Sequence, residues 1–428
     1  MSALRERLGR LRGEAAPAAV APAPPAAEPP EQPSLVERLR RLGGARTGQP
    51  PAARAPGAPA SAAARDAPRL DEAVLAAALG AEQLAPGVLC RRRRLPLAQR
   101  HGNAARHPDP DAVRLLLPDA PPDPDGWCVI DTETSGLAGG TGTWVFMVGI
   151  ARWEGAVLAL SQLLLTRLDA EAAFLDHLRA AVADAELLLS YNGKSFDLPL
   201  LAARLRLAAR PDPLVRLAHL DLLHPVRRAF ATRWPDCRLA SVEARLLGHV
   251  RHGDLPGAEA PAAWLAWLRA GDGRRLGAVL AHNAVDLLSV AALPARLAAV
   301  HASPTDFGAD PARIARWWLA AGDAERARGV LGAADPAVRD TEAAHLLAEL
   351  HARAADWPAA LALWEPLAVA GDAAAHEALA KHYEHRAKDL RRALAHARRL
   401  PPGAAAERRC KRLTYKLGRE MRRSDGGH

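Results

Sequence analysis

The stretch VIDTE at Val129–Glu133 joins a short apolar run to two acidic residues that lie two positions apart. Neighbouring residues on a β-strand point to opposite faces, so Asp131 and Glu133 point to the same face and can converge on one cation. An Asp-x-Glu pair alone occurs by chance in many chains. Its place at the end of an apolar strand favours a functional pair.

The residues that follow predict a mixed layer of strands and helices. Apolar runs predict strands over residues 144–153, 157–165, 187–191 and 217–222. Helical patterns separate the later strands and continue to about residue 298. Three strands in a meander, followed by alternating helices and strands, predict an α/β layer fold with a mixed sheet flanked by helices.

Two further motifs bring acidic residues to the first pair. Asp197 ends the stretch SYNGKSFD at Ser190–Asp197, which leaves the fourth strand and enters a helix. His282 and Asp286 lie four positions apart in the last helix of the domain, which places both on one helix face. The GKS within SYNGKSFD is not a phosphate-binding P-loop, because that motif needs glycine where Leu188 stands.

Together these residues predict a metal site. Four carboxylates crowded together are unstable without cations, because like charges that close cannot all stay ionised. The oxygens of Asp131, Glu133, Asp197 and Asp286 suit Mg²⁺ or Mn²⁺ and not Zn²⁺. Two such ions about 3.5–4 Å apart can clamp the attacking and leaving oxygens of a phosphodiester. We therefore expect two ions at these carboxylates, and we expect His282 to be the general base for the attacking water.

The motifs resemble the three exonuclease motifs of the DEDD superfamily, and they occur in the same order. Over roughly residues 70 to 420, the chain resembles a bacterial ribonuclease-H-like exonuclease family with a C-terminal TPR-like tail. The stretches that carry it are DTETSGLAGGTGT (131–143), YNGKSFDLP (191–199), HLDLLHP (219–225), RHGDLPG (251–257) and HNAVD (282–286).

This resemblance implies a ribonuclease-H-like fold and metal-dependent 3′→5′ exonuclease activity. One group of the family works with a DEAD-type helicase in the repair of mitomycin damage, which implies DNA with a free 3′ end as substrate and a helicase as partner. The histidine subclass usually places its histidine five residues before the last aspartate. Here the spacing is four, as in the tyrosine subclass, and we assign His282 as base because it occupies the facing helical position.

Other polar and glycine positions near the carboxylates are predicted to contact the substrate. Lys194 precedes every other lysine by more than 180 residues, which suggests an ammonium placed for a phosphate, although chance explains it equally well. Asp221 ends the fifth strand, and a helix cap is slightly favoured there over a ligand. The predicted substrate contacts are Thr132, Thr134, Gly136, Leu137, Asn192, Lys194 and Asp221.

Composition favours a polyanionic partner and a reducing compartment. The net charge is +9 and the pI is about 10.0, but only five of the 57 basic residues are lysines, so compositional drift explains part of the charge. The four cysteines form no C-x-x-C pair. We expect no secretory signal, because the N-terminus has no apolar core, and no apolar run of membrane-spanning length. The sequence predicts a cytoplasmic protein without membrane contact.

The chain divides by composition and pattern. An Ala/Pro/Arg-rich stretch is predicted to be a disordered arm, with leucine stripes at Leu4–Leu11 and Leu35–Leu42 that suit either docking helices or, as we favour, a solvated linker. Four arginines at Arg91–Arg94 are predicted to lie on a loop, as a phosphate contact or a solvated run. The predicted division is arm 1–66, N-terminal extension 67–122, exonuclease domain 123–300, helical region 301–420 and basic tail 421–428.

The helical region repeats. Aspartate recurs at Asp323, Asp356 and Asp389, and alanine follows each four residues later, so the period is 33. That period is close to the helix–turn–helix repeat of TPR arrays, and we predict two to three degenerate units. Their concave face would dock a protein, unless the repeats only support the catalytic domain.

Two other classes of function compete with the exonuclease. A non-enzymatic adaptor would grip nucleic acid and bind a partner through its repeats, but the presence of all four carboxylates argues against it. A structure-specific endonuclease or a ribonuclease on the same scaffold stays open, because one fold hosts several such reactions.

Overall fold

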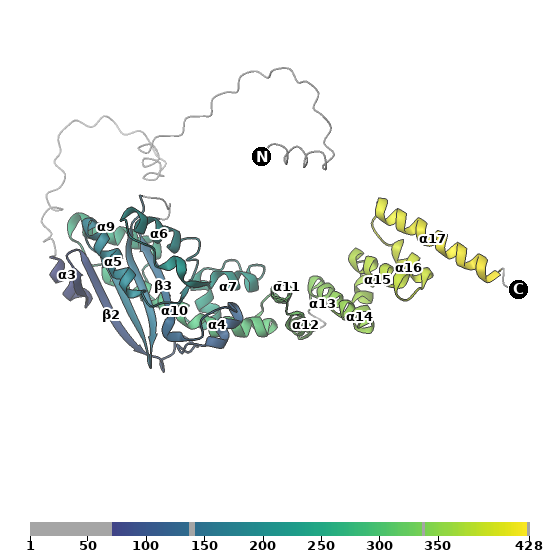
Figure 1. Ribbon diagram of the computed structural model, residues 1–428, viewed down its shortest axis with the longest axis horizontal. Helices are drawn as coiled ribbons and strands as arrows, with labels where there is room; N and C mark the ends of the chain where they lie inside the picture. The colour runs from purple at the N-terminus through teal and green to yellow at the C-terminus, as the bar shows by residue number, and fades with distance from the viewer. Residues whose placement is uncertain (1–70, 137–141, 336–338, 426–428) are drawn as a thin grey trace, which may run out of the picture. The chain divides into compact units, whose positions relative to one another are not determined.

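The computed structural model describes residues 71–136, 142–335 and 339–425, all within the compact unit Asp66–His428 (Figure 1). The strands are β1 Glu82–Ala85, β2 Val88–Pro96, β3 Trp127–Thr134, β4 Val145–Glu154, β5 Val157–Leu165, β6 Leu187–Ser190 and β7 Ala218–Asp221. The helices of the sheet domain are α3 Glu72–Leu79, α4 Pro110–Leu116, α5 Glu171–Ala181, α6 Asp197–Leu207, α7 Leu223–Phe230, α8 Leu239–Val242, α9 Ala260–Ala270 and α10 Leu276–Ala302. The helices after them are α11 Pro311–Ala320, α12 Ala324–Gly332, α13 Thr341–Arg353, α14 Trp357–Val369, α15 Ala373–His385, α16 Leu390–Ala397 and α17 Ala404–Asp425.

The seven described strands form one mixed sheet in the order β1-β2-β5-β4-β3-β6-β7. Strands β3, β4 and β5 form the antiparallel meander that the apolar runs predicted, and β6 and β7 extend the sheet in parallel with β3. Each parallel connection contains a helix, as crossovers require. The predicted fold class, a mixed sheet flanked by helices and followed by an all-helical region, is confirmed.

The loop predicted for Arg91–Arg94 is wrong, because these residues lie within β2 and pair with β5 along their whole length. Strand β1 pairs with β2 only at Val88–Cys90, so the arginines follow an open edge of the described sheet. Arg92 forms an ion pair with Glu82, and Arg94 pairs with Glu154 at 2.5 Å. Charged residues on an edge strand discourage pairing with another chain, which accounts for the run without any ligand.

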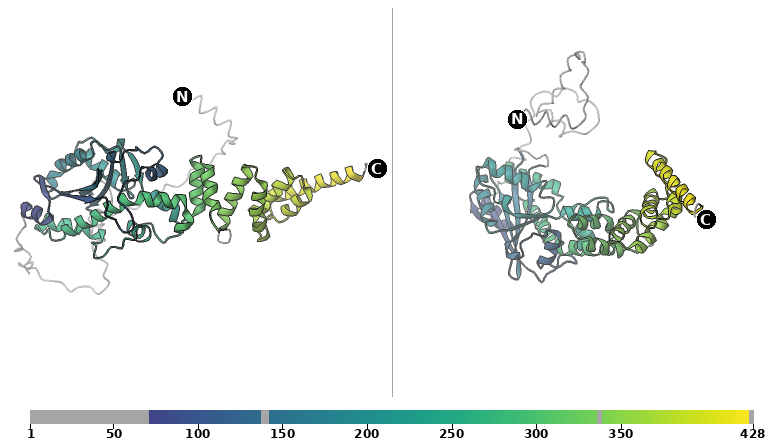
Figure 2. Two further views of the ribbon diagram at one scale, coloured as in Figure 1. Left: turned by 90° about the horizontal axis from the view of Figure 1, so that it is seen from below. Right: turned by 45° about the vertical axis from the view of Figure 1, so that its right-hand side comes forward.

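The sheet lies between two layers of apolar side chains, and alternate residues of β3 face opposite layers. Trp127 and Val129 pack with α4, α7 and most of α10, whereas Cys128 and Ile130 pack with α5 and α6. Figure 2 shows the strands between these helices from two further directions. The two layers thus bury residues Trp127–Ile130 of β3 on both sides.

The tryptophans in and beside strands β3 and β4 pack within the fold. Trp127 and Trp153 are buried and meet edge to face, with ring centroids 5.9 Å apart. Trp144 is half-buried, and the guanidinium of Arg204 lies 4.1 Å from its ring. These contacts leave the indoles inside the fold and not on a base-stacking surface.

Helix α10 is long and apolar enough to cross a membrane by length and composition, which the sequence analysis did not expect. It crosses the sheet and contacts β3, β4 and β5, and 67% of its most apolar window is buried. Burial against a sheet explains its apolar composition. Two of its polar residues, His282 and Asp286, line the candidate site.

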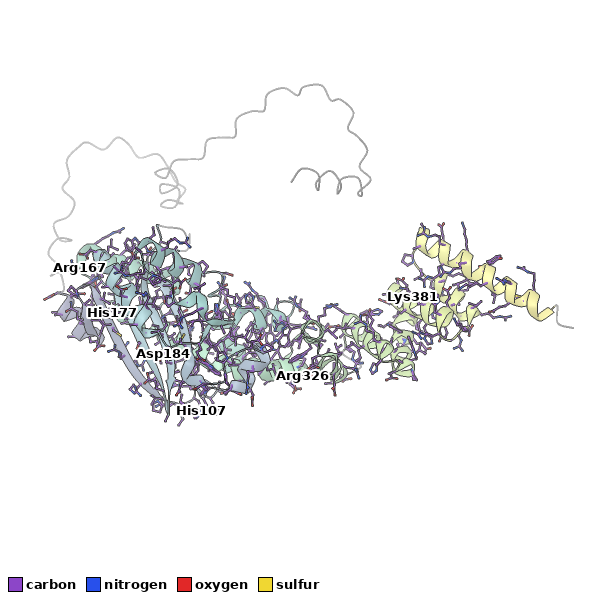
Figure 3. All side chains as sticks on the ribbon, in the orientation of Figure 1. His107, Arg167, His177, Asp184, Arg326 and Lys381 are labelled. Atoms are coloured by element: carbon purple, nitrogen blue, oxygen red, sulfur yellow. The ribbon has the colours of Figure 1, made fainter. Side chains whose placement is uncertain are left out.

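The helices after α10 pair in succession, α11 with α12, α13 with α14, and α15 with α16. The repeated aspartates Asp323, Asp356 and Asp389 cap the second helix of each pair, where each carboxylate accepts a backbone N–H three residues on. The repeated alanines are fully buried. Figure 3 labels Arg326 of α12 and Lys381 of α15 in this region. The period of 33 therefore marks structurally equivalent helix starts.

The residue before each repeated aspartate has a left-handed backbone. The φ angles are +83° at Gly322, +60° at Ala355 and +58° at Lys388. Only glycine adopts this conformation without strain, so the second and third units keep the turn at a cost of about 1–2 kcal/mol each. The same turn geometry in three units supports a common repeat.

Several predictions concern residues that the structure does not describe. The arm 1–66 with its two leucine stripes, and Leu137 among the predicted substrate contacts, lie outside the described residues. The predicted domain limits stay predictions. Strands β1 and β2 of the predicted N-terminal extension join the domain sheet, and α17 continues through Met421 to Asp425.

Candidate active site

Strand β3 carries the first acidic pair to the edge of the cavity described below. Asp131 and Glu133 lie at its C-terminal end and point to the same face, because they are two residues apart. Glu133 is only 8% exposed. Glu133 is thus shielded from water, and Asp131 beside it is half-buried.

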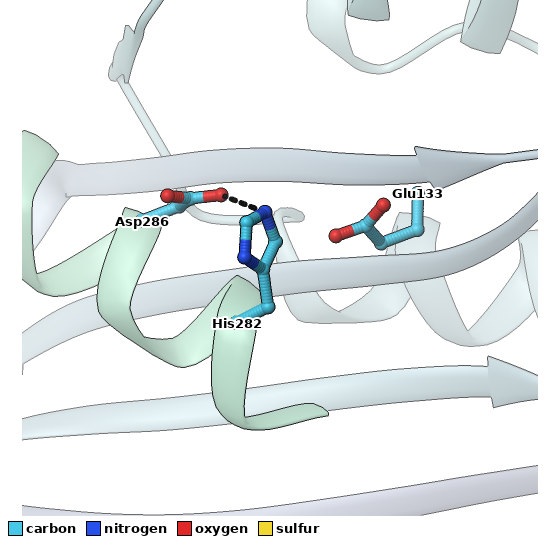
Figure 4. A group of neighbouring side chains, drawn as sticks. All are labelled: Glu133, His282 and Asp286. Atoms are coloured by element: carbon cyan, nitrogen blue, oxygen red, sulfur yellow. Dashed lines mark ion pairs between the residues drawn. The ribbon is translucent and has the colours of Figure 1, made fainter. Parts of the chain in front are cut away.

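Helix α10 brings His282 and Asp286 against this pair. The Nε2 atom of His282 lies 3.4 Å from Oδ2 of Asp286, as one helical turn requires. One donor atom each of Glu133, His282 and Asp286 lies within 4.8 Å of the other two, and Figure 4 shows the three side chains facing one another. The i, i+4 prediction therefore places both residues at the acidic pair.

Asp197 reaches the same place from the first turn of α6. Its Oδ1 accepts a hydrogen bond from the backbone N–H of Thr132 at 3.1 Å, and another from the Thr132 hydroxyl. Asp197 is 5% exposed. Thr132, which was predicted to contact substrate, here fixes Asp197 beside β3.

A cavity of about 410 Å³ contains all five predicted catalytic side chains. Of the predicted substrate contacts, Thr132, Thr134, Gly136 and Asn192 line it. Tyr191, Phe196 and Pro261 supply apolar walls. The cavity lining therefore combines acidic with apolar side chains.

Asp221 and Lys194 are absent from the described lining of this cavity. The buried carboxylate of Asp221 accepts backbone N–H bonds from Asn192 at 2.8 Å, Lys194 at 3.0 Å and Leu223 at 3.1 Å. Asn192 has a left-handed backbone with φ of +67°. Asp221 thus holds the tight turn that leads to Asp197. This is a structural role, the alternative to a ligand role that the sequence analysis slightly favoured. The side chain of Lys194 is exposed.

Burial and mutual repulsion raise the pKa values of the carboxylates. Burial raises the pKa of Glu133 to about 8, and the charges of Asp286 and Asp197 add to the rise. Burial raises the pKa of Asp197 to about 6, against hydrogen bonds from Thr132. Burial and three neighbouring carboxylates hold the pKa of Asp131 well above its usual range. Without a cation the site holds protons at neutral pH, as a divalent metal site should.

The metal-free protein is expected to lose stability as the pH rises from about 4.5 to about 8. In that interval the folded protein keeps a proton on Glu133 that the unfolded chain releases, so each step in pH favours unfolding. Saturating Mn²⁺ should remove the slope. The unfolding temperature in EDTA, measured across this interval for wild type and Glu133→Gln, checks it. Identical slopes in the two proteins would contradict the expectation.

Sequence reasoning missed a cluster behind His282 and Asp286. The Nδ1 atom of His282 lies 2.7 Å from Oδ2 of Asp254, and Arg251 donates to Asp254, Asp286 and Glu243. RHGDLPG carried part of the family resemblance, but no periodicity or spacing links it to HNAVD. A neutral imidazole that donates its Nδ1–H to Asp254 has the lone pair of Nε2 on the side of Asp286.

Asn283 was missed as well. Its amide donates to Oδ2 of Asp131 at 2.8 Å and accepts from Gln162 Nε2 at 2.8 Å. Asp131, Gly149 and Gln162 are direct neighbours across β3, β4 and β5, so Asn283 spans this row from above. The amide fixes the orientation of Asp131, and Gly149 supplies the space for it.

Gly149→Ala is expected to lower both stability and activity. The new Cβ would overlap the Asn283 amide oxygen and lie 2.7 Å from its nitrogen, and this fully buried amide is bonded on both sides. Overpacking of this kind costs about 1–3 kcal/mol. Urea unfolding and a nuclease assay measure the two losses. Gly329→Ala, where a Cβ meets nothing within 4 Å, is the matched control, and equal behaviour of the two variants would refute the expected clash.

The sheet and its acidic cavity define the class of protein. The family profile of the RNase H superfamily matches residues 128–298, from β3 to near the end of α10. The chain therefore carries an RNase H-like domain. Membership of this superfamily supports nuclease activity on nucleic acid in general, and RNase H-like nucleases usually use divalent metals. The buried acidic and histidine cluster fits such a metal requirement.

A narrower relationship comes from a bacterial protein. The chain is 30% identical over 305 residues to the uncharacterized protein YprB of Bacillus subtilis (strain 168), and the alignment covers 68% of this chain and 74% of YprB. The chain belongs to the YprB family.

A solved structure, the family B DNA polymerase of the hyperthermophilic archaeon Pyrobaculum calidifontis, matches with a TM-score of 0.33 and 14% identity. The match covers 65% of this chain and 35% of that polymerase, so this chain spans about a third of its length. A likeness at that TM-score bears on neither site nor function.

Proposed function

We propose that this protein is a metal-dependent 3′→5′ exonuclease of the DEDD type that acts on DNA. The observation that carries the proposal is the convergence of Asp131, Glu133, Asp197 and Asp286 with His282 in one cavity. The polarity and the preference for DNA rest on the family resemblance of the sequence motifs. Membership of the RNase H superfamily supports phosphodiester hydrolysis.

The four carboxylates are the proposed ligands of two Mg²⁺ or Mn²⁺ ions. Such ions, when bound, polarise the phosphate and neutralise the charge that develops during in-line displacement. Asn283 holds Asp131, and Thr132 holds Asp197, so two ligands have fixed orientations.

His282 is the proposed general base. Asp254 accepts its Nδ1 proton at 2.7 Å, and Nε2 therefore faces Glu133 and Asp286 as a proton acceptor. A water between these groups would give its proton to Nε2 as it attacks the phosphorus. The imidazolium so formed lies beside two carboxylates that stabilise it.

Some of the other lining residues are proposed substrate contacts. We propose that Thr134, Gly136 and Asn192, which line the cavity, contact the terminal nucleotide, and that Thr132 acts through Asp197. Lys194 lies outside the cavity lining, and we propose that it contacts a phosphate of the substrate. Asp221 acts by shaping the turn that contains Asn192 and Lys194.

The region after α10 is the proposed docking module. We propose that residues 123–300 form the exonuclease domain and residues 301–420 the TPR-like repeats. A DEAD-type helicase is the proposed partner and DNA repair the proposed setting, both from the resemblance. The capped helix starts at Asp323, Asp356 and Asp389 support a regular array.

Linear and circular single-stranded DNA separate the proposed activity from its alternatives. With Mn²⁺ the protein should degrade the linear strand and leave the circle intact, and EDTA should stop the reaction. Cleavage of the circle would identify an endonuclease. Degradation of RNA alone would identify a ribonuclease. Failure to cleave any of these by metal-loaded protein would favour the adaptor.

A further inference from the structure

Arg251 lies among three acidic side chains and is largely buried, with 13% of its side chain exposed. Its Nε and one terminal nitrogen donate to the two oxygens of Glu243, both at 2.6 Å. The other terminal nitrogen donates to Oδ2 of Asp254 at 2.9 Å, and the nitrogen shared with Glu243 also donates to Oδ1 of Asp286. All three nitrogens of the guanidinium are therefore used.

Glu243 is the fixed end of this arrangement. Its side chain is fully buried, and it begins a π-helical turn, Glu243–Leu247. Besides Arg251 it accepts a hydrogen bond from the hydroxyl of Ser289 at 2.5 Å, and that hydroxyl lies 2.7 Å from Nε2 of His101. A bidentate pair with a carboxylate held this way leaves the guanidinium one orientation.

The two outward bonds of Arg251 lead to different parts of the candidate site. Asp286 has Oδ1 tied to Arg251, so its Oδ2 is directed to the side where His282 lies, 3.4 Å away. Asp254 is tied to Arg251 and in turn holds Nδ1 of His282 at 2.7 Å. One guanidinium thus sets the orientation of a carboxylate ligand and, through Asp254, of the imidazole.

We propose that Arg251, clamped by Glu243, is a positioning residue that aligns Asp286 and His282 for the reaction. The proposal rests on the exonuclease function proposed above. A guanidinium is needed because an ammonium cannot make a fork to Glu243 and still direct two donors at Asp254 and Asp286. An ion pair with only a structural role would influence stability but not the metal site.

The test is Arg251→Lys, which keeps the charge and removes the fork. We expect kcat on single-stranded DNA with Mn²⁺ to fall about 10–100-fold, with KM for DNA changed by less than about twofold. Mn²⁺ affinity, measured by electron paramagnetic resonance without DNA, should weaken about 10–100-fold, because Asp286 loses its fixed orientation. Arg412→Lys is the matched control, since Arg412 makes the same fork to the fully buried Glu384 outside the acidic site.

The double variant Arg251→Gln/Glu243→Gln guards against a folding defect, because it removes the charge of the fully buried Glu243 together with that of its partner. It should keep an unfolding temperature near that of wild type and show the same losses. Wild-type kcat and Mn²⁺ affinity in a folded Arg251→Lys protein would overturn the proposal. If intact protein cleaves no DNA, the exonuclease function fails, and the Mn²⁺ affinity alone then decides: weakening supports a positioning role, and no change refutes it.

Discussion

Asp131→Asn is expected to lower the nuclease turnover by about 10³-fold or more while the protein stays folded. The pKa of Asp131 is raised by burial and by the charges of Asp286, Asp197 and Glu133. Asparagine keeps the size of the side chain and can still accept the Asn283 bond, but it offers a metal one neutral oxygen. Turnover with saturating Mn²⁺ measures the loss.

The same substitution should stabilise the metal-free protein, because the raised pKa of Asp131 makes the folded protein hold a proton that the unfolded chain releases at neutral pH, and asparagine removes that cost. The unfolding temperature in EDTA should therefore be higher for Asp131→Asn than for wild type at neutral pH. Asp310→Asn is the control, since Asp310 is a buried helix cap remote from the acidic group. A variant that retains more than about a tenth of wild-type turnover would exclude Asp131 as a metal ligand.

His282→Ala is expected to lower kcat by about 10²–10⁴-fold, the usual contribution of a general base. The four carboxylates remain, so Mn²⁺ should still bind and KM for DNA should change little. Imidazole added to the reaction should restore part of the rate, because it can fill the space against Asp254. Single-turnover kinetics with saturating Mn²⁺ measure the chemical step directly.

His224→Ala is the matched control for that experiment, because His224 is exposed and lies outside the cavity lining. Unchanged turnover in His282→Ala would remove the histidine from the mechanism. Loss of Mn²⁺ binding together with activity would instead assign it to the metal site, where its Nε2 is close enough to Glu133 and Asp286 to serve.

Local spacing predicted the residues that share one element. Asp131 and Glu133 are two apart on a strand, and His282 and Asp286 four apart on a helix, so regular geometry brings each pair to one face. The apolar runs predicted strands β3 to β7, because a strand buried in a sheet is rich in apolar residues. Asp323, Asp356 and Asp389 recur because each repeat needs an N-cap at the same place.

Contacts between distant segments were not predictable in this way. Arg251 and Asp254 lie outside any helix or strand, and Asn283 acts on Asp131 from 152 positions away in the chain. The arginines of β2 have no apolar alternation, and pairing with β5 makes them a strand. Tertiary packing between distant segments determines where these residues lie. The local sequence pattern contains no signal for such contacts.

The most direct test of the central claim uses two single-stranded DNA oligonucleotides, one labelled at its 3′ end and one at its 5′ end, with Mn²⁺ and with Asp286→Asn in parallel. The expected result is immediate release of the 3′ label as a mononucleotide, stepwise shortening of the 5′-labelled strand, and neither change in the variant. Release of the 5′ label first, internal cleavage, or undiminished activity of Asp286→Asn would contradict the assignment.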